Sequence, residues 1–268
     1  MLRKNSYGIR LLSVVIPAFK QERTIIKNIN SITSSLDALG LKYEIIVVVD
    51  GLLDNTFKKA SKLKSKKLKV VGYPKNHGKG HAIRYGMLHA KGDIIGFIDA
   101  GMDIHPAGMS MLLNHMIWYN ADIIVGSKLH PASKVEYPIY RTILSWGYRT
   151  LTRILFGFKV RDTQVGLKFF KRKVVRKVLP KLVVKRYAFD IEILAVAYSY
   201  GYKRIYEAPV EINFKKNVIT SKDLIKIVSL MIWDTAAVFY RMHFLRYYKI
   251  NKRKKKAFSK KLSLSISR

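Results

Sequence analysis

The chain has 268 residues, 49% of them hydrophobic and 25% charged, a composition that indicates a folded protein rather than a disordered one. It contains 51 Lys and Arg against 17 Asp and Glu, so its formal net charge is +34. Such a charge favours an anionic partner: nucleic acid, an anionic membrane surface or a phosphorylated small molecule. Lys-rich chains are also common in thermophilic organisms, so part of the excess of positive charge has an explanation other than an anionic partner. Cysteine is absent, which excludes disulfides, thiolate zinc sites and a cysteine nucleophile.

The N-terminal sequence gives an expectation about location. The first ten residues do not have the pattern of a signal peptide, because the apolar run after them is short and ends at Pro17. We therefore expect the protein to stay on the cytoplasmic side.

Buried strands and helices alternate in the first part of the chain. The predicted strands are 11–19, 43–50, 68–73 and 93–100, and the predicted helices are 21–40, 52–65 and 80–92. This alternation predicts an α/β fold with a mostly parallel central sheet and helices on both faces. Ligands bind outside the carboxyl ends of the strands in such sheets. Pro17, Ala18, Asp50 and Asp99 stand at those ends.

The second part of the chain is less regular. Its pattern predicts helices at 106–121, 137–157 and 187–202, a strand at 121–128, a turn and strand at 161–173, and a strand at 203–214. Pro209 lies inside the last strand, which places that strand at an edge of the sheet.

The C-terminal region predicts an attachment to membranes. Residues 222–248 are apolar and aromatic, but Asp234 and Arg241 interrupt them, so the segment falls short of a spanning helix. An amphipathic helix lying on the membrane surface fits better, and the basic tail at 251–268 would contact an anionic cytoplasmic leaflet. The alternative is a core helix followed by a solvated tail. The predicted division is a catalytic domain at 1–220, an interfacial helix at 221–250 and a disordered tail at 251–268.

Two acids follow the strand at 93–100 and raise the question of a metal. Asp99 ends the strand and Asp103 comes four residues later. Strand-end carboxylates can hold a divalent ion, and they also occur simply as turn-forming residues. Gly78, Lys79 and Gly80 precede a predicted helix, whose first turn is suited to binding anions. Lys79 is equally well interpreted as a surface lysine.

Several motifs in this order resemble the family 2 glycosyltransferases with the GT-A nucleotide-sugar fold. They are VVIPAFKQE, VVVDGLLDNT, YPKNHGKGHAIRYGMLHAKGD and FIDAGMDIHP. RDTQVGLKFF and YAFDIEIL narrow the resemblance to polyprenyl- or dolichyl-phosphate hexose synthases. It covers roughly residues 11 to 214.

The resemblance implies a divalent ion, Mg²⁺ or Mn²⁺, held by Asp99 and Asp103. The sequence departs from the family here, because the usual D-x-D motif has an acid where this chain has Gly101. The missing ligand would be replaced by water, diphosphate or Asp103. A divalent ion at this place would neutralise the departing diphosphate as a Lewis acid.

The resemblance also implies a nucleotide site. Asp50 resembles the family residue that contacts the nucleoside, although Val49 and Leu52 replace an acid and a serine of the family motif. The other candidates for this site are Pro17, Ala18, Glu22, Lys79 and Gly80. Asp54 is equally well interpreted as the N-terminal cap of the following helix.

A third group of residues resembles the acceptor and sugar site of the family. Arg141, Arg161 and Lys168 are candidates for the acceptor phosphate, because guanidinium groups match phosphate oxygens. Asp162 and Gln164 belong to a D-T-Q element that lines the sugar site in the family. Asp190 or Glu192 would be the general base if the acceptor were a sugar hydroxyl. Acids in a first helical turn are also favoured by the helix dipole alone.

The expected reaction is inverting transfer of a hexose from a nucleotide-sugar to dolichyl or polyprenyl phosphate, with UDP-glucose the favoured donor. The alternatives are GDP-mannose as donor, or a sugar hydroxyl as acceptor in glycan or glycolipid synthesis. The enzyme would sit peripherally on the cytoplasmic face of the membrane. A nucleic-acid-binding protein lacks support, since the sequence has no known recognition motif. A family member that has lost catalysis is the last alternative, suggested by Gly101 and Leu52.

Overall fold

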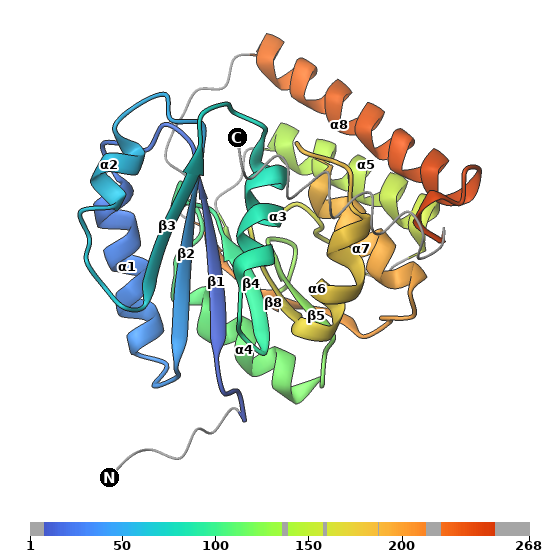
Figure 1. Ribbon diagram of the computed structural model, residues 1–268. Helices are drawn as coiled ribbons and strands as arrows, with labels where there is room; N and C mark the ends of the chain where they lie inside the picture. Colours follow the sequence, from blue (N-terminus) through green and yellow to red (C-terminus); the bar gives the residue numbers. More distant parts are fainter. Residues whose placement is uncertain (1–7, 136–138, 158–159, 187, 213–220, 250–268) are drawn as a thin grey trace.

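The computed structural model of the chain describes residues 8–135, 139–157, 160–186, 188–212 and 221–249 (Figure 1). For 134–135, 139–145 and 221–227 the description covers the backbone. The tail predicted at 251–268 lies outside the described residues.

A seven-stranded sheet forms the centre of the molecule, in the order β3-β2-β1-β4-β7-β5-β8. All neighbouring pairs are parallel except those of β7, which runs antiparallel to both β4 and β5. The strands are β1 (Leu12–Ala18), β2 (Tyr43–Asp50), β3 (Leu68–Tyr73), β4 (Ile94–Ile98), β5 (Ile123–Ser127), β7 (Leu167–Lys171) and β8 (Ile205–Pro209). The predicted α/β fold with a mostly parallel sheet is confirmed.

Helices cover both faces of this sheet. They are α1 (Ile25–Asp37), α2 (Thr56–Ala60), α3 (Lys79–His89), α4 (Gly108–Trp118), α5 (Ile139–Phe156), α6 (Arg172–Val178), α7 (Phe189–Ser199) and α8 (Ser221–His243). Short 3₁₀ turns follow at η1 (Leu179–Lys181) and η2 (Tyr247–Lys249). A separate two-stranded sheet pairs β6 (Lys134–Val135) with β9 (Glu211–Ile212).

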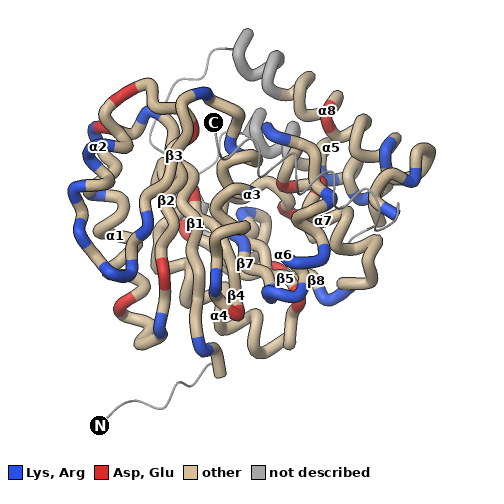
Figure 2. Tube along the Cα trace, viewed as in Figure 1, with Lys and Arg blue, Asp and Glu red and all other residues tan. Residues whose placement is uncertain are grey.

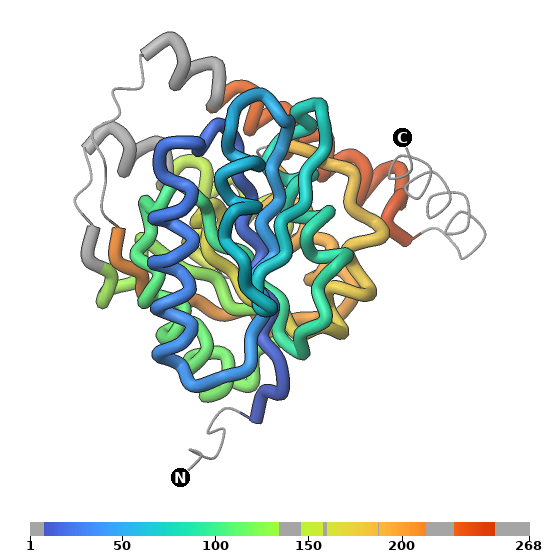
Figure 3. The backbone as a smooth tube through the Cα atoms, turned by 60° about the vertical axis from the view of Figure 1, so that its left-hand side comes forward, coloured from blue at the N-terminus to red at the C-terminus, as the bar shows by residue number. Residues whose placement is uncertain are grey.

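The core divides into two layers, one on each face of the sheet. Apolar side chains of α1 and α4 pack with Val14, Ile16 and Val47 on one face. Those of α3, α6 and α7 pack with Val15 and Ile46 on the other. Figure 3 shows α1 in blue and α3 in teal on opposite sides of the sheet. Strands buried on both faces read as continuous apolar runs, which is why they were predictable from the sequence.

The antiparallel strand β7 fits beside β4 because a glycine faces an aromatic ring. Gly96 of β4 is the register partner of Phe169 in β7. A Cβ atom at position 96 would lie 1.8 Å from Cδ1 of Phe169, so no larger residue has room. Phe169 itself is fully buried in the core.

The structure corrects several details of the sequence prediction. Residues 172–181 form α6 and η1, which were not predicted. The helix predicted over 222–248 ends at His243, and the chain turns at Arg246, whose φ is +47°. The predicted edge position of β8 is confirmed, since β8 pairs only with β5 in the sheet order. Within the described part of the chain, none of the helices combines the length and apolarity needed to cross a membrane.

Replacing Gly96 with alanine should destabilise the fold, because the added methyl group overlaps the Phe169 ring. We expect the free energy of unfolding to fall by about 1–3 kcal/mol or more, measured by urea denaturation. Gly147→Ala is the matched control, since position 147 is helical and no described atom lies within 4 Å of its Cβ. That variant should be neutral or slightly more stable. Equal stability of the two variants would contradict the packing argument.

Candidate active site

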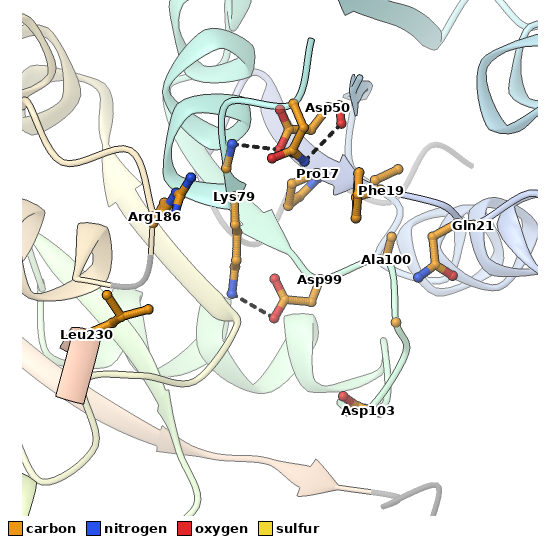
Figure 4. Close-up of a pocket in the computed structure, with 14 residues that line it drawn as sticks. Pro17, Phe19, Gln21, Asp50, Lys79, Asp99, Ala100, Asp103, Arg186 and Leu230 are labelled. Carbon is orange, nitrogen blue, oxygen red and sulfur yellow. Dashed lines mark hydrogen bonds and ion pairs between the residues drawn. The ribbon is translucent and has the colours of Figure 1, made fainter. Parts of the chain in front are cut away.

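A cavity of about 700 Å³ opens at the carboxyl edge of the central sheet (Figure 4). It combines carboxylates, two basic side chains and apolar groups. Its lining residues are Pro17, Ala18, Phe19, Gln21, Asp50, Asn76, Gly78, Lys79, Asp99, Ala100, Gly101, Asp103, Arg186 and Leu230.

The sheet topology explains why these residues meet. The chain places β2 and β3 on one side of β1 and β4 on the other, so the connections after β1 and β4 leave in opposite directions. A crevice forms at such a switch point, outside the carboxyl ends of the strands. Asp50 ends β2, Asp99 follows β4, and Lys79 is the first residue of α3.

The Asp50 carboxylate fixes the glycine-rich turn in front of α3. It accepts hydrogen bonds from the backbone N–H of His77 at 2.7 Å, the N–H of Gly78 at 2.9 Å and Nδ2 of Asn76 at 3.0 Å. Asp50 is 3% exposed. The nucleoside contact predicted for Asp50 stays a prediction. In the structure the Asp50 carboxylate holds the 76–78 turn in place.

The two glycines of this turn allow it to pack against the segment before α7. Gly78 has φ +101°, and a Cβ there would lie 2.6 Å from the carbonyl oxygen of Lys185. A Cβ at Gly80 would lie 2.5 Å from Cβ of Phe189. This close contact brings Arg186 to the cavity, where it lies on the same side as Leu230 of α8 (Figure 4).

Lys79 and Asp99 form an ion pair inside the cavity. The distance between Lys79 Nζ and Asp99 Oδ2 is 2.8 Å, and the two side chains are 38% and 34% exposed. Burial alone would lower the pKa of Lys79, but the carboxylates of Asp99 and Asp190 outweigh it and raise the pKa above its ordinary value. Lys79 therefore stays a cation.

The second oxygen of Asp99 has no partner among the described residues. Oδ1 is buried without a hydrogen bond. The carboxylate rests against Gly166, where a Cβ would lie 1.9 Å from Oδ2, and the backbone N–H of Asp99 donates to the Gly166 carbonyl at 3.0 Å. A carboxylate that lines a cavity together with Asp103, and that has one oxygen without a hydrogen-bond partner among the described residues, fits a divalent cation. In the described part of the chain, no cluster of three His, Asp or Glu surrounds it, so further ligands must come from elsewhere.

Other predicted site residues lie outside the cavity lining. Glu22 accepts from Asn55 at the start of α2, at 3.0 Å and 3.2 Å, instead of framing the cavity. Asp162 is 6% exposed and accepts from the backbone N–H of Lys128 and of Gln164. The backbone N–H of Arg161 donates to Glu207 at 2.6 Å. Their predicted roles stay predictions, but these contacts fix the 161–164 turn beside β5 and β8.

Two more candidates and the predicted cap need separate mention. Nε2 of Gln164 is buried without a hydrogen-bond partner among the described residues, and Gln164 is not among the residues that line the cavity. Arg141 belongs to α5, but its side chain lies outside the described part. The N-cap residue of α2 is Asn55 and not Asp54 as predicted, although Oδ1 of Asp54 accepts from the N–H of Thr56, the first residue of that helix, at 3.0 Å.

The structure places Lys168 inside the core, which does not fit a role in holding an acceptor phosphate. Its side chain is fully buried, and Nζ forms an ion pair with Asp190 and donates to the Val165 carbonyl at 2.6 Å. Burial lowers the pKa of Lys168, and Asp190 partly offsets this. Lys168 therefore serves as the buried counter-ion of Asp190.

Glu192 is also enclosed, away from the cavity lining. It is 0% exposed and accepts hydrogen bonds from the backbone N–H of Val183 and Val184 and from the Tyr248 hydroxyl, the last at 2.6 Å. Burial raises the pKa of Glu192, while these donors act in the opposite direction. Glu192 thus links the segment after η1 to Tyr248 in η2.

Sequence reasoning missed several contributors to the site. Arg186, Asn76 and Leu230 line the cavity, and Gly166 supports Asp99. Asn76 and Gly166 lie in motifs that were already singled out, and their neighbours drew the attention instead. Arg186 and Leu230 carry no sequence signal of their own, because only the tertiary fold brings them to the sheet edge.

Comparison with known proteins identifies the family. The profile of Glycosyl transferase family 2 matches residues 13–179. A human dolichyl-phosphate beta-glucosyltransferase is 31% identical over 250 residues, covering 87% of this chain and 76% of that protein. The Saccharomyces cerevisiae protein of the same name is 28% identical over 264 residues, covering 90% of this chain and 78% of that protein. The chain belongs to glycosyl transferase family 2, whose members are enzymes that transfer sugars.

The fold agrees with solved structures. A glucosyl-3-phosphoglycerate synthase from Mycobacterium tuberculosis, in complex with Mn²⁺, UDP and phosphoglyceric acid, matches with a TM-score of 0.66 at 23% identity. The match covers 94% of this chain and 82% of that chain. The GT-A fold expected from the sequence is confirmed.

Replacing Gly166 with alanine should impair glycosyl transfer while the protein still folds. The new methyl group would occupy the place of the Asp99 carboxylate, so this carboxylate must move. We expect a loss of about a hundredfold in kcat/KM, because small displacements of a catalytic group are costly. Gly108→Ala is the control, since its Cβ would make an ordinary contact at 3.4 Å with Leu167. An active Gly166→Ala enzyme would refute the supporting role of Gly166.

Proposed function

We propose that this chain is an inverting glucosyltransferase that moves glucose from UDP-glucose to dolichyl or polyprenyl phosphate. The observation that carries the proposal is the composition of the cavity. Its partly buried lining includes Asp99 and Lys79, and its exposed lining, the rim, includes Asp103, Arg186 and Leu230 of helix α8. Such a site suits an acceptor that has an anionic head and an apolar tail. The names of the relatives support the same acceptor and the same sugar.

The chemistry asks for charge neutralisation more than for a base. A phosphate monoester has its second pKa at about 6, so the acceptor is largely ionised at neutral pH. Its oxygen attacks the anomeric carbon opposite the diphosphate, and the new C–O bond forms as the old one breaks. The electron pair of the broken bond leaves with UDP, and the configuration at the anomeric carbon inverts. No proton has to be removed from the acceptor.

Two basic side chains are placed to balance the charge of this step. Lys79 and Arg186 are the Lys and Arg residues among the described cavity lining. Lys79 reaches the inner carboxylate Asp99, so it is suited to the donor diphosphate once that diphosphate is present. Arg186 lies on the same side of the cavity as Leu230, so we assign it to the acceptor phosphate, which its guanidinium fork matches.

A divalent ion, Mg²⁺ or Mn²⁺, is part of the proposal. Asp99 and Asp103 would hold it, and the unpaired Oδ1 of Asp99 supports this assignment. When bound, the ion would supply Lewis-acid stabilisation to the leaving diphosphate. The protein residues hold the remaining groups in line.

The geometry disfavours a sugar-hydroxyl acceptor. That acceptor would need a carboxylate base, and Asp190 or Glu192 was the candidate. Asp190 is paired with the buried Lys168, and Glu192 is saturated by Val183, Val184 and Tyr248. Neither acid lines the cavity.

The outer side of α8 supports the predicted membrane attachment. Leu230, Trp233, Tyr240 and Phe244 follow one another at helical spacing and are 36%, 74%, 53% and 69% exposed. The opposite side of α8 is buried at Thr235 and Val238, where the Thr235 hydroxyl bonds Tyr148 of α5 at 2.8 Å. We define the four exposed residues as the α8 stripe. Figure 1 shows α8 on the outside of the molecule beside α5.

The proposal places the α8 stripe in the surface of an anionic cytoplasmic leaflet. Aromatic residues favour the interface between water and lipid, and the exposed Arg246 and Lys249 follow the stripe closely. Leu230 belongs both to the α8 stripe and to the cavity rim, so the cavity would open beside the lipid that carries the acceptor. Figure 2 shows basic residues on many elements, so charge alone does not select this surface.

A transfer assay tests the reaction. Purified protein with Mn²⁺ and a short polyprenyl phosphate should move label from UDP-glucose into the organic phase, and not from GDP-mannose. Asp99→Asn should reduce this rate by about a hundredfold or more, because it removes the carboxylate charge that would hold the divalent ion. Asp37→Asn, which alters the exposed pair with Lys67 and the hydrogen bond from the Tyr43 hydroxyl, both outside the cavity lining, should leave the rate unchanged. Transfer from GDP-mannose alone would replace the donor assignment, and no transfer from either would reject the function.

A vesicle assay tests the attachment. The double variant Trp233→Ser and Phe244→Ser should bind liposomes of phosphatidylcholine and phosphatidylserine about tenfold more weakly than the wild type, because it removes apolar anchors from the α8 stripe. Trp118→Ser is the matched control, since Trp118 is 68% exposed on α4. Equal binding by both variants would show that α8 is not the attachment site.

A further inference from the structure

Lys79 forms an ion pair with one of the two Asp99 oxygens that a metal would use. Its ammonium group lies 2.8 Å from Oδ2 of Asp99, while Oδ1 of the same carboxylate is buried and without a partner among the described residues. The position of the carboxylate is fixed, because Gly166 packs directly behind it. A divalent ion and Lys79 therefore share the same carboxylate.

The charge balance of the cavity is unfavourable for a metal on its own. Three carboxylates line it, from Asp50, Asp99 and Asp103. Both oxygens of Asp50 accept hydrogen bonds from the 76–78 turn, and Lys79 already neutralises Asp99. Hard divalent cations bind through several oxygens and are favoured by the number of ligand charges. Asp99, Asp103 and Lys79 together offer a net charge of only about −1 to an ion of charge +2.

We propose that Lys79 competes with the divalent ion for Asp99, so that the ion binds tightly only together with the nucleotide diphosphate. The diphosphate brings the negative charge that the protein site lacks, and it gives the ammonium group of Lys79 a second anion. Lys79 thereby sets the order of loading, with the nucleotide and ion entering as a unit. This inference rests on the nucleotide and metal part of the proposed function.

Substitution of Gly101 is an independent way to alter the charge balance among Asp99, Asp103 and Lys79. The backbone of Gly101 does not require glycine, since the left-handed residue of this loop is its neighbour Met102, with φ +58°. A Cβ at position 101 would find only Asp103 Oδ2 nearby, at 3.8 Å. A carboxylate introduced there would point to the same region as Asp103. Gly101→Asp should therefore restore negative charge without disturbing the fold.

Equilibrium binding of Mn²⁺, followed by electron paramagnetic resonance of the free ion, tests the proposal without any turnover. In the absence of UDP, Lys79→Met should bind Mn²⁺ about tenfold more tightly than the wild type, because it removes a neighbouring positive charge at nearly the same length. Gly101→Asp should shift the affinity in the same direction. Adding UDP should tighten Mn²⁺ binding strongly in the wild type and much less in Lys79→Met.

Controls separate this effect from general changes of charge. Lys75→Met removes an exposed lysine of the same loop outside the cavity lining and should leave Mn²⁺ affinity at the wild-type value. Lys79→Arg keeps the cation and should also resemble the wild type. Lys79→Gln is a second neutral variant, and thermal melting identifies any variant that does not fold.

The proposal is overturned if folded Lys79→Met and Lys79→Gln bind Mn²⁺ no more tightly than the wild type without UDP. By linkage, Mn²⁺ must tighten UDP binding by the same factor by which UDP tightens Mn²⁺ binding, which checks the measurement internally. Failure of UDP to bind under any condition would count against the proposed function. The comparison of the variants in Mn²⁺ alone would still decide the role of Lys79.

Discussion

The contact between β4 and β7 is the constraint on which the site depends. Two positions without side chains let the strands approach: Gly96 lies under the Phe169 ring, and Gly166 lies against the Asp99 carboxylate. The first glycine sets the packing of the sheet, and the second sets the direction of a charged group at its edge. Stability and chemistry are thus decided at the same strand pair, a few residues apart. A side chain at Gly96 would overlap the Phe169 ring, and one at Gly166 would move the carboxylate that the cavity is built around.

The charged groups of the site are paired with other groups of the protein and are also positioned to bind ligands. Asp50 bonds the turn before α3, and Asp99 pairs with Lys79. Deeper in the molecule, Lys168 neutralises Asp190. A buried carboxylate needs donors or a counter-ion, because desolvation is expensive. Such pairing prepares the cavity electrostatically before any ligand enters, and it leaves Oδ1 of Asp99 without a hydrogen-bond partner among the described residues, at a place that favours a cation.

The fold and the inner half of the site were predictable from the sequence, whereas the rim was not. Strands buried on both faces are continuous apolar runs, and their final residues, Asp50 and Asp99, mark the edge where ligands bind. Lys168 misled the prediction, since a lysine in a motif looks like a phosphate ligand until its strand is seen to be buried. Arg186 and Leu230 reach the cavity through contacts between distant segments, which local patterns do not encode.

The bond between Tyr248 and Glu192 has a consequence for the order of synthesis. Glu192 is fully buried, and the Tyr248 hydroxyl is one of its few donors. The ribosome delivers α7 well before Tyr248, because domains emerge from the N-terminal end first. Until Tyr248 leaves the exit tunnel, the Glu192 carboxylate has the backbone N–H groups of Val183 and Val184 as donors but lacks the Tyr248 hydroxyl. The last of these contacts to the buried Glu192 is therefore made late in translation.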